Sequence, residues 1–375
     1  MRASKSDMPA IAESSGLSLC FGTRPQVIKA GGLLRVLGTR WKVTTVDTGQ
    51  HYDFELNQLL YQQLEISRPD HFLDVGSADP ASQTAAVLVR TAQLLQRNRP
   101  VAMVVIGDTN STLGCALAAS KEGVPLVHVE AGLRSNEPNL PEEANRRLVD
   151  VLGRLLCAPS EVSAGRLRAE LVSGTVVTTG DVARDVLCHH LRLASPPTPD
   201  PPFVLATVHR SAVTGDRDAL RSVLLGLGQL GLPVVFPIHP RTRKAIDDFD
   251  LVSHVPPTVY LCAPMGYLEA IAAVRDATVV VTDSGGLQRE AYWLGRPCVT
   301  LRSETEWVET LECGANALVA PLEAGDSLAR IVGTQRERQK DSPWSTDVYG
   351  DGHAAERIAD AISTNFGTLE RSGAE

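Results

Sequence analysis

The sequence predicts an α/β protein with two doubly wound domains, each built around a parallel sheet. Short β-branched apolar runs recur along the chain with helix-period segments between them, which is the pattern of consecutive βα units. The stretch 195–202 (SPPTPDPP) holds five prolines in eight residues and interrupts this pattern. The alternation then starts again, and a length of 375 residues is sufficient for two domains.

In the first half of the chain, apolar runs such as LSLCF, AMVVI and LVHV have the length and composition of buried strands in a parallel sheet. The expected strands cover 17–21, 41–47, 101–107, 126–130, 155–159 and 176–179. Between them, apolar residues repeat with a helical period, and a proline marks the start of two of these segments. The expected helices cover 25–37, 81–96, 111–121, 142–153, 161–171 and 183–193.

The proline-rich stretch 195–202 suits neither a helix nor a central strand, so it is predicted to be a semi-rigid linker. It separates a first Rossmann-like domain, residues 1–194, from a second one, residues 203–353. In the second domain, the expected strands cover 203–208, 234–238, 259–262, 278–282 and 298–301. The segment 354–363 predicts one more amphipathic helix near the end of the chain.

The charge balance and the cysteines narrow the class of protein. The chain has 36 basic and 44 acidic residues, whereas proteins that grip nucleic acid usually carry a basic surplus, so no nucleic-acid partner is expected. Seven cysteines without a C-x-x-C pair argue against a disulfide framework or a thiolate zinc site and favour a cytoplasmic location. The N-terminal segment lacks the apolar core of a signal peptide, and no apolar run approaches the ~18 residues of a membrane span. No membrane association is therefore expected.

Two such domains place the carboxyl ends of both sheets around one cleft, where ligands of open α/β sheets bind. Candidate functional residues are therefore those that directly follow strands. After the first strand, FGTRPQVIKA places Arg24 and Lys29 at a helix start, where they would present positive charge to an anion. An ordinary strand-to-helix turn with solvated cations is the alternative. This motif is neither G-x-G-x-x-G nor a Walker sequence, which weakens nicotinamide and P-loop hypotheses.

Three carboxylates in the first domain follow strands or begin a helix. Asp108 comes directly after the apolar run VVIG, Glu130 ends the run LVHVE, and Glu142 lies in a first helical turn after Pro141. Carboxylates gathered at one cleft suit proton transfer at a carbon atom. For Asp108, the alternative is a helix cap formed together with Thr109.

Polar residues also follow the strands of the second domain. His209 and Arg210 are candidates for a phosphate contact or for acid–base chemistry, and the spacing does not rank His209 against His239 in the similar segment FPIHPR. In TDSGGLQREA, the backbone N–H groups at the helix start would bind a pyrophosphate, and an acidic residue one turn on could accept from ribose hydroxyls. The residues concerned are Ser284, Gly285, Gly286 and Glu290. A capped strand-to-helix turn is the alternative.

Six motifs, taken together and in this order, resemble the non-hydrolysing UDP-N-acetylglucosamine 2-epimerase family: GTRPQVIK, TGQHYD, GDTNSTL, HVEAGLR, PEEANRR and TDSGGLQREA. The resemblance extends over about residues 17–318. It implies a glycosyltransferase-B-like pair of Rossmann-like domains, with the active site in the interdomain cleft. It also implies that the C-terminal helix, at about 354–375, crosses back to the first domain, and that the protein is a homodimer.

The family reaction inverts carbon 2 of a UDP-sugar by anti elimination of UDP to a 2-acetamidoglucal, followed by return of UDP to the other face. The resemblance implies catalytic roles for Asp108, Glu130, Glu142 and His209. It implies a UDP-sugar as the partner, with contacts from the first loop and from the second domain. These UDP-binding residues are Arg24, Lys29, Ser284, Gly285, Gly286 and Glu290, to which the strand-end Arg210 adds a phosphate contact. No cofactor and no metal are required by this route.

Some residues depart from the common pattern of the family. Gln26 replaces a Glu, and Trp307-Val308 replaces Arg-Pro, which favours the branch that acts on modified sugars such as UDP-2,3-diacetamido uronates. Members often bind a second UDP-GlcNAc as an activator. Its TGQH element is present as Gln50 and His51, but the usual basic residue before Gln83 is missing, which argues against activation. A hydrolysing epimerase that releases N-acetylmannosamine and UDP, a glycosyltransferase and a UDP-sugar sensor remain alternatives.

Overall fold

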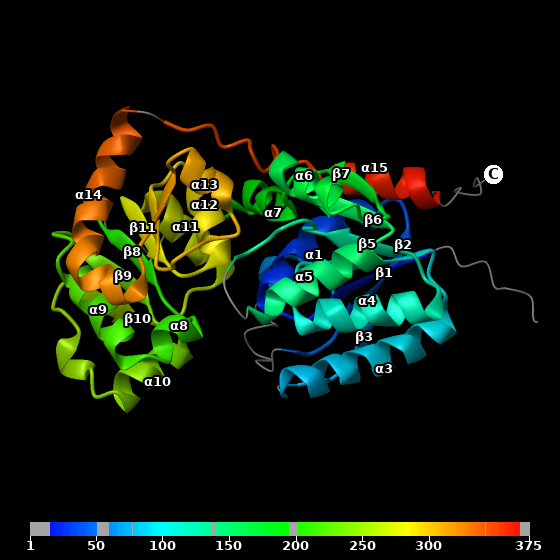
Figure 1. The fold of residues 1–375 in the computed structure, drawn as a ribbon, viewed down its shortest axis with the longest axis horizontal. Coiled ribbons are helices and arrows are strands. Elements are labelled where there is room, and N and C mark those ends of the chain that lie inside the picture. Colours follow the sequence, from blue (N-terminus) through cyan, green and yellow to red (C-terminus); the bar gives the residue numbers. More distant parts are fainter. Residues whose placement is uncertain are drawn as a thin grey trace, which may run out of the picture.

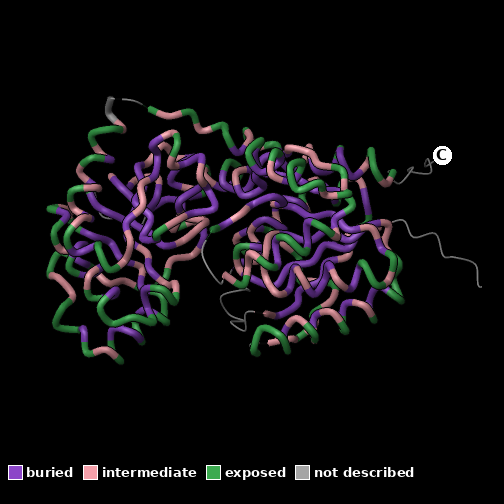
Figure 2. Tube along the Cα trace, viewed as in Figure 1, coloured by how far each residue is buried: buried purple, intermediate pink, exposed green. Residues whose placement is uncertain are grey.

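The computed structural model describes residues 16–50, 60–76, 78–136, 140–194, 202–341 and 343–367. Two α/β domains lie side by side (Figure 1). Strands occupy the buried interior of each domain, and the helices turn their exposed sides outward (Figure 2). The predicted α/β fold with two parallel sheets is confirmed. The expected linker lies outside the described residues except for Pro202.

The first sheet has seven parallel strands among the described residues, in the order β3-β2-β1-β4-β5-β6-β7. The strands are β1 (Gly16–Phe21), β2 (Lys42–Asp47), β3 (His71–Phe72), β4 (Ala102–Ile106), β5 (Leu126–Val129), β6 (Leu155–Ala158) and β7 (Thr175–Thr178). The helices of this domain are α1 (Arg24–Leu37), α3 (Pro80–Asn98), α4 (Asn110–Glu122), α5 (Pro141–Leu152), α6 (Glu161–Ala169) and α7 (Val182–His190). Every strand and helix predicted here is present, with ends that differ by up to three residues. The edge strand β3 was not predicted because it contains only two residues.

The second sheet has six parallel strands in the described region, in the order β10-β9-β8-β11-β12-β13. The strands are β8 (Val204–Thr207), β9 (Val234–Pro237), β10 (Val259–Cys262), β11 (Val279–Thr282), β12 (Cys298–Thr300) and β13 (Asn316–Leu318). The helices are α8 (Ser211–Thr214), α9 (Arg217–Gly228), α10 (Pro240–Asp248), α11 (Tyr267–Asp276), α12 (Gly285–Trp293), α13 (Val308–Glu312) and α14 (Ala324–Asp341), with 3₁₀ turns at Val252–His254 and Pro321–Glu323. The short strand β13 was not predicted, whereas the five predicted strands are present.

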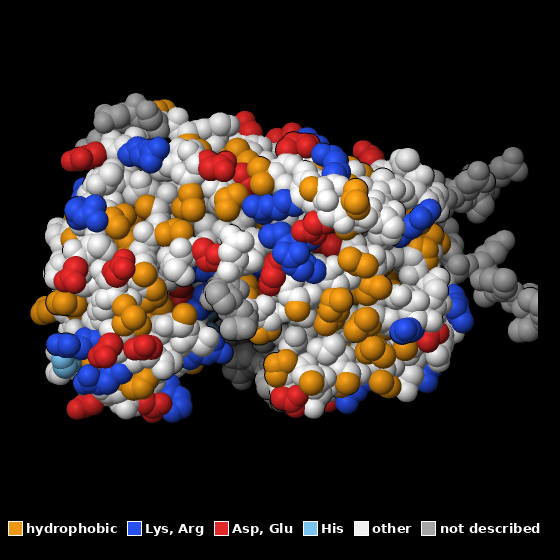
Figure 3. Space-filling view, viewed as in Figure 1, with side chains coloured by type: hydrophobic (Ala, Val, Ile, Leu, Met, Phe, Trp, Pro, Cys, Tyr) orange, Lys and Arg blue, Asp and Glu red, His pale blue; other side chains and the backbone are white. Residues whose placement is uncertain are grey.

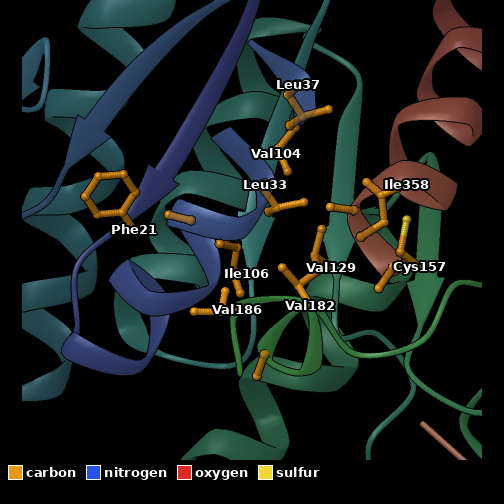
Figure 4. Packing of buried hydrophobic residues seen from close by; sticks show 14 of the residues in the cluster. Phe21, Leu33, Leu37, Val104, Ile106, Val129, Cys157, Val182, Val186 and Ile358 are labelled. Atoms are coloured by element: carbon orange, nitrogen blue, oxygen red, sulfur yellow. The ribbon is translucent and has the colours of Figure 1, made fainter. Parts of the chain in front are cut away.

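The central strands are apolar along their whole length because helices cover both faces of each sheet. All five residues of β4 are fully buried, and the side chains of Val104 and Ile106 pack with Leu33 of α1 (Figure 4). A strand buried on both faces needs a continuous apolar run rather than an alternating one. This is why the strands could be recognised from the sequence.

The last helix, α15 (Ala354–Phe366), packs on the first domain although it follows the second one in the chain. After α14 the chain runs along one edge of the molecule to reach it (Figure 1). The apolar side of α15 contacts α1, α7 and β6, and Ile358 lies next to Cys157 of β6 (Figure 4). The Asp185 carboxylate of α7 accepts hydrogen bonds from the backbone N–H groups of Ala354 (3.0 Å) and Ala355 (2.7 Å), so it satisfies the start of α15.

Each sheet has one point at which the direction of winding reverses, and a crevice is expected there. In the first sheet the direction of winding reverses between β1 and β4, and in the second sheet it reverses between β8 and β11. Ligands of doubly wound sheets bind at the carboxyl ends of strands at such switch points. The segments that follow β1, β4, β5, β8 and β11 are therefore the segments in which a site is expected.

Candidate active site

A cavity of about 230 Å³ lies between the two domains and takes its wall from both of them. The first domain contributes Pro25, Lys29, Asp108, Glu130, Leu133, Leu140, Glu142 and Arg146. The second domain contributes His209, Arg210, Ser284, Gly285, Gly286, Arg289, Arg302, Glu306 and Trp307. Charged side chains of both signs dominate this wall, which suits a polar, anionic ligand whose reaction moves a proton.

The first loop is fixed by the buried side chain of Gln26. Its Oε1 accepts from the backbone N–H of Gly22 (2.9 Å), and its Nε2 donates to the Ile106 carbonyl (2.6 Å) and to Thr112 Oγ1 (2.8 Å). An ionised Glu could not donate these last two hydrogen bonds. Gln26 therefore connects the loop after β1 to the end of β4 by hydrogen bonds. These bonds fix the start of α1 and with it the position of the Lys29 side chain in the cavity.

Glu130 is a buried carboxylate held between two cations. Its backbone has a φ of 75°, a left-handed conformation that costs energy for a non-glycine residue. Its Oε2 pairs with Lys29 of the first domain, and its Oε1 accepts from Arg289 Nη1 of the second domain at 3.0 Å. Burial opposes ionisation of Glu130, but the charges of Lys29 and Arg289 outweigh it and hold the pKa of this carboxyl below its usual value. Glu130 is therefore ionised.

The Asp108 side chain is more exposed than that of Glu130, at 28% against 9%. Asp108 Oδ2 accepts a hydrogen bond from Arg146 Nε at 2.8 Å, and Arg146 Nη2 forms an ion pair with the same oxygen at 2.6 Å. Thr109, not Asp108, caps α4 by accepting from the backbone N–H of Thr112. Within the described part of the chain, Glu142 has no ion-pair partner, so its carboxylate is free to meet a ligand.

The structure separates the two histidines that the sequence could not rank. His239 accepts from the backbone N–H of Arg241 (3.1 Å) and so caps α10, whereas His209 lines the cavity. His209 is positioned by the buried Asp283, whose Oδ2 accepts from the backbone N–H groups of His209 (2.8 Å) and Arg210 (2.7 Å). The Oδ1 of Asp283 lies 3.2 Å from His209 Nδ1, which leaves Nε2 as the ring nitrogen available to a ligand.

The start of α12 forms an anion-binding wall of the cavity. Ser284 caps this helix by accepting from the Leu287 N–H, and the glycines that follow leave their backbone N–H groups close to the surface of the cavity. A Cβ at Gly285 would lie 3.1 Å from Glu306 Oε1, so glycine keeps this approach open. Together with Arg210, this helix end presents positive charge to a diphosphate.

The structure brings most of the predicted site residues together. Nine of them line the cavity: Lys29, Asp108, Glu130, Glu142, His209, Arg210, Ser284, Gly285 and Gly286. Arg24, Gln50 and Glu290 are not part of its wall. The Oε1 of Gln50 accepts from Ser111 Oγ (2.6 Å) and from the Ser111 N–H (3.2 Å), so this side chain is occupied inside the first domain. His51 lies outside the described residues.

Sequence reasoning missed five charged or aromatic residues of the wall: Arg146, Arg289, Arg302, Glu306 and Trp307. Arg146 follows Glu142 by four positions on α5, a helical spacing that could have indicated a shared face. Trp307 was noted only as a departure from a pattern, yet its ring covers the Arg289 guanidinium at 3.9 Å. Glu306 is ionised, because the charges of Arg302, Arg146 and Arg210 overcome its burial and lower its pKa to about 2.

No cluster of three or more His, Cys, Asp or Glu side chains has an arrangement that could hold a metal ion in the described part of the chain. Among the described helices, none is both long and apolar enough to span a bilayer.

Comparison of the sequence with known proteins indicates one family of enzymes. A family model described as UDP-N-acetylglucosamine 2-epimerase matches residues 37–363. The UDP-2,3-diacetamido-2,3-dideoxy-D-glucuronate 2-epimerase of Pseudomonas aeruginosa is 37% identical over 355 residues, covering 91% of this chain and 98% of that protein. The UDP-N-acetylglucosamine 2-epimerase of Methanococcus maripaludis is 32% identical and covers 92% and 98%, respectively.

Solved structures agree with these relatives. The crystal structure of Methanocaldococcus jannaschii UDP-GlcNAc 2-epimerase in complex with UDP-GlcNAc and UDP superposes with a TM-score of 0.86 at 32% identity, over 93% of this chain and 99% of that one. The calicheamicin glycosyltransferase CalG4 superposes with a TM-score of 0.56 at 14% identity, a likeness that concerns the fold alone. The architecture is therefore glycosyltransferase-B-like.

Proposed function

Because the chain belongs to the UDP-N-acetylglucosamine 2-epimerase family, we propose that it inverts carbon 2 of a UDP-2-acetamido sugar without releasing free sugar. The proposal rests on the residues that line the cavity. Three carboxylates of the first domain, Asp108, Glu130 and Glu142, face the anion-binding start of α12 across one small cavity. Proton transfer at carbon and stabilisation of a departing diphosphate are the two requirements of this reaction, and each has residues placed for it.

In the proposed reaction, a carboxylate removes the proton from carbon 2 while the bond from carbon 1 to the diphosphate oxygen breaks, and UDP keeps the electron pair. The backbone N–H groups of Gly285 and Gly286 and the cation Arg210 support the departing charge, and His209 lies beside it. UDP then returns to carbon 1 of the 2-acetamidoglucal, and a proton is delivered to the other face of carbon 2. Atoms and charge balance without a further reactant.

The ion pairs of Glu130 suggest how substrate could activate it as the base. In the free enzyme both of its oxygens are engaged by cations, which lowers its pKa and makes it a weak base. A diphosphate that entered the cavity would compete for Lys29 and Arg289. Their attraction to the phosphates would release the Glu130 carboxylate and raise its pKa, so that the base becomes effective only when substrate is present.

The test of the proposed function is hydrogen exchange at carbon 2. Incubated with UDP-GlcNAc in deuterated water, the enzyme is expected to give both C2 epimers with deuterium at C2, as followed by NMR. Asp108→Asn protein prepared in parallel controls for a contaminating epimerase. Free UDP that appears in step with free sugar would identify a hydrolysing enzyme, transfer that needs an added acceptor would identify a glycosyltransferase, and binding without turnover would identify a sensor.

A second substrate candidate is a UDP-2,3-diacetamido uronate. The observation that favours it is Trp307, which stands in the cavity wall where the common family pattern has an arginine. The Pseudomonas aeruginosa relative that acts on such a sugar, by its name, is also similar over nearly all of the chain. The exchange experiment should therefore include this uronate beside UDP-GlcNAc, and the larger kcat/KM identifies the substrate.

Glu290 provides a prediction about pH. Burial raises the pKa of this carboxyl to about 7, despite the opposing charges of Arg289 and Arg24. If its ionised form accepts from the ribose hydroxyls, as we propose, the affinity for UDP-GlcNAc rises with pH as Glu290 loses its proton. Between pH 6 and pH 8 the affinity is expected to increase by about tenfold, because one proton is released on binding.

Calorimetry on the Asp108→Asn protein measures this affinity without conversion of the substrate. UDP-GlcNAc is the ligand of choice, since the terminal phosphate of UDP itself titrates near pH 6. Adding Glu290→Gln keeps an acceptor oxygen but removes the titration, so the pH dependence should disappear. A pH dependence that persists in the double variant would exclude Glu290 as its source.

The domain bounds, the homodimer and the cytoplasmic location complete the proposal. The proposed domains are residues 1–194 together with the C-terminal helix, and the UDP-binding domain 203–353, with 195–202 as the linker between them.

Hydrophobic side chains gather on the first domain over α3, α4 and α5 (Figure 3), where Val89, Leu148 and Val151 are exposed. Apolar patches of this kind support an interface with a second copy.

A further inference from the structure

A buried histidine–aspartate pair lies directly behind the candidate carboxylates. His128 belongs to β5 and Asp150 to α5, and both side chains are essentially inaccessible to solvent. His128 Nδ1 lies 2.7 Å from Asp150 Oδ1, and its Nε2 lies 2.9 Å from the Gly107 carbonyl oxygen. Neither residue lines the cavity, so substrate does not contact this pair.

Two oxygen atoms face the ring nitrogens of His128, one on each side. A carbonyl oxygen can only accept, so Nε2 must carry a proton. Burial opposes ionisation of Asp150, but His128 and Arg134 outweigh it and hold the pKa of Asp150 below its usual value, so this carboxylate also accepts. Both ring nitrogens of His128 thus lie at hydrogen-bond distance from an oxygen, and the ring is held from two sides inside the protein.

The same pair holds the backbone on both sides of the site. Gly107 precedes Asp108 and has a φ of 68°, and Gly132 follows Glu130 by two positions with a φ of 83°. Asp150 Oδ2 accepts from the Gly132 N–H (3.3 Å) and lies 2.8 Å from Arg134 Nη1. One buried histidine–aspartate pair thus connects the turn after β4 with the turn after β5.

We propose that His128 and Asp150 are positioning residues that set the spacing between the Asp108 and Glu130 carboxylates. This inference rests on the proposed function, since it assigns a role to the distance between two groups of that site. Backbone at positive φ has few intrinsic constraints at glycine, so the turns need external hydrogen bonds to keep one geometry. Displacing a reacting group by about 1 Å can cost about a hundredfold in rate, so such a pair is useful to catalysis.

Two substitutions separate the two hydrogen bonds of His128. Asn places an amide nitrogen near the position of Nδ1, so His128→Asn keeps the bond to Asp150 and loses the one to Gly107. Gln places its amide nitrogen near Nε2, so His128→Gln keeps the bond to Gly107 and loses the one to Asp150. Each variant is expected to lower kcat by about 10–100-fold while KM for the UDP-sugar changes less than about threefold, as is common for residues that orient catalytic groups.

Leu95→Ala is the matched control, because Leu95 is fully buried in α3 of the same domain but contacts neither turn. It should lower the melting temperature as much as the histidine variants and leave kcat unchanged. If the histidine variants lose activity only in proportion to this control, or keep their kcat, the pair is structural and the proposal is overturned. Activity of the unmodified enzyme is measured first, and its absence would contradict the proposed function instead.

A second measurement does not depend on turnover. In protein labelled with ¹⁵N at histidine, the His128 signals, assigned by their loss in His128→Gln, should show a proton on Nε2, the nitrogen that faces the Gly107 carbonyl. An unprotonated Nε2 would contradict the hydrogen bond to Gly107 and with it the simultaneous hold on both turns.

Discussion

Replacing Glu130 with Gln is expected to lower kcat by ~10³-fold while the affinity for UDP stays the same or increases. A Gln side chain keeps the shape of Glu130 but cannot take the C2 proton, and a positioned general base contributes about 10²–10⁴-fold to such a reaction. The change also frees Lys29 and Arg289, which are then available to the diphosphate. Steady-state kinetics and calorimetry with UDP measure the two effects separately.

The control for this experiment is Glu161→Gln, because Glu161 lies at the exposed start of α6. It should leave both kcat and UDP affinity unchanged. If Glu130→Gln weakened UDP binding in parallel with the loss of turnover, Glu130 would serve to hold the cations in place and would not be the base. Near-normal turnover would remove Glu130 from the catalytic set.

Arg289→Met is expected to have the largest effect on stability. Arg289 is buried between the two domains, pairs with Glu130 and Asp181, and stacks against Trp307. Its removal takes the cation away from the buried Asp181 carboxylate and leaves Glu130 with Lys29 as its remaining partner. Breaking a buried ion pair typically costs about 3–5 kcal/mol in the free energy of unfolding. Turnover should fall as well, since Glu130 loses one of the two groups that fix it.

Urea denaturation and steady-state kinetics measure these losses, and a second substitution tests their cause. Adding Asp181→Asn to Arg289→Met removes the buried charge that has lost its partner, so the double variant should recover part of the lost stability. Asp181 also accepts from the Ala183 N–H at 2.9 Å, a bond that Asn can keep through its side-chain oxygen. No recovery in the double variant would show that the lost stacking, and not the unpaired charge, destabilises Arg289→Met.

The sequence was sufficient to predict the longer strands of both sheets and the segments that line the cavity. Both follow from local rules, because fully buried parallel strands are continuous apolar runs and ligands bind after them. Glu130 could therefore be named as a site residue from its place after LVHV. The two-residue strand β3 and the three-residue strand β13, each at the edge of its sheet, were missed because so few residues produce no pattern.

The partners of the site residues could not be predicted. Glu130 and Arg289 are 159 positions apart and meet only because two domains close on each other. Nor does a local pattern reveal that Gln26 hydrogen-bonds to the end of β4, 80 positions further on. The charge state of a carboxylate depends on such partners. The acid–base properties of this site could therefore be deduced only from the three-dimensional arrangement.

The return of α15 to the first domain has a consequence for how the protein is made. Ile358, Ala359 and Ile362 belong to the same apolar cluster as Leu33 and Leu37 of α1. During translation, the first domain therefore emerges from the ribosome without part of its own core and cannot complete it until α15 (Ala354–Phe366) has been synthesised. A nascent chain that stops between the two domains would therefore leave part of this apolar cluster exposed to water.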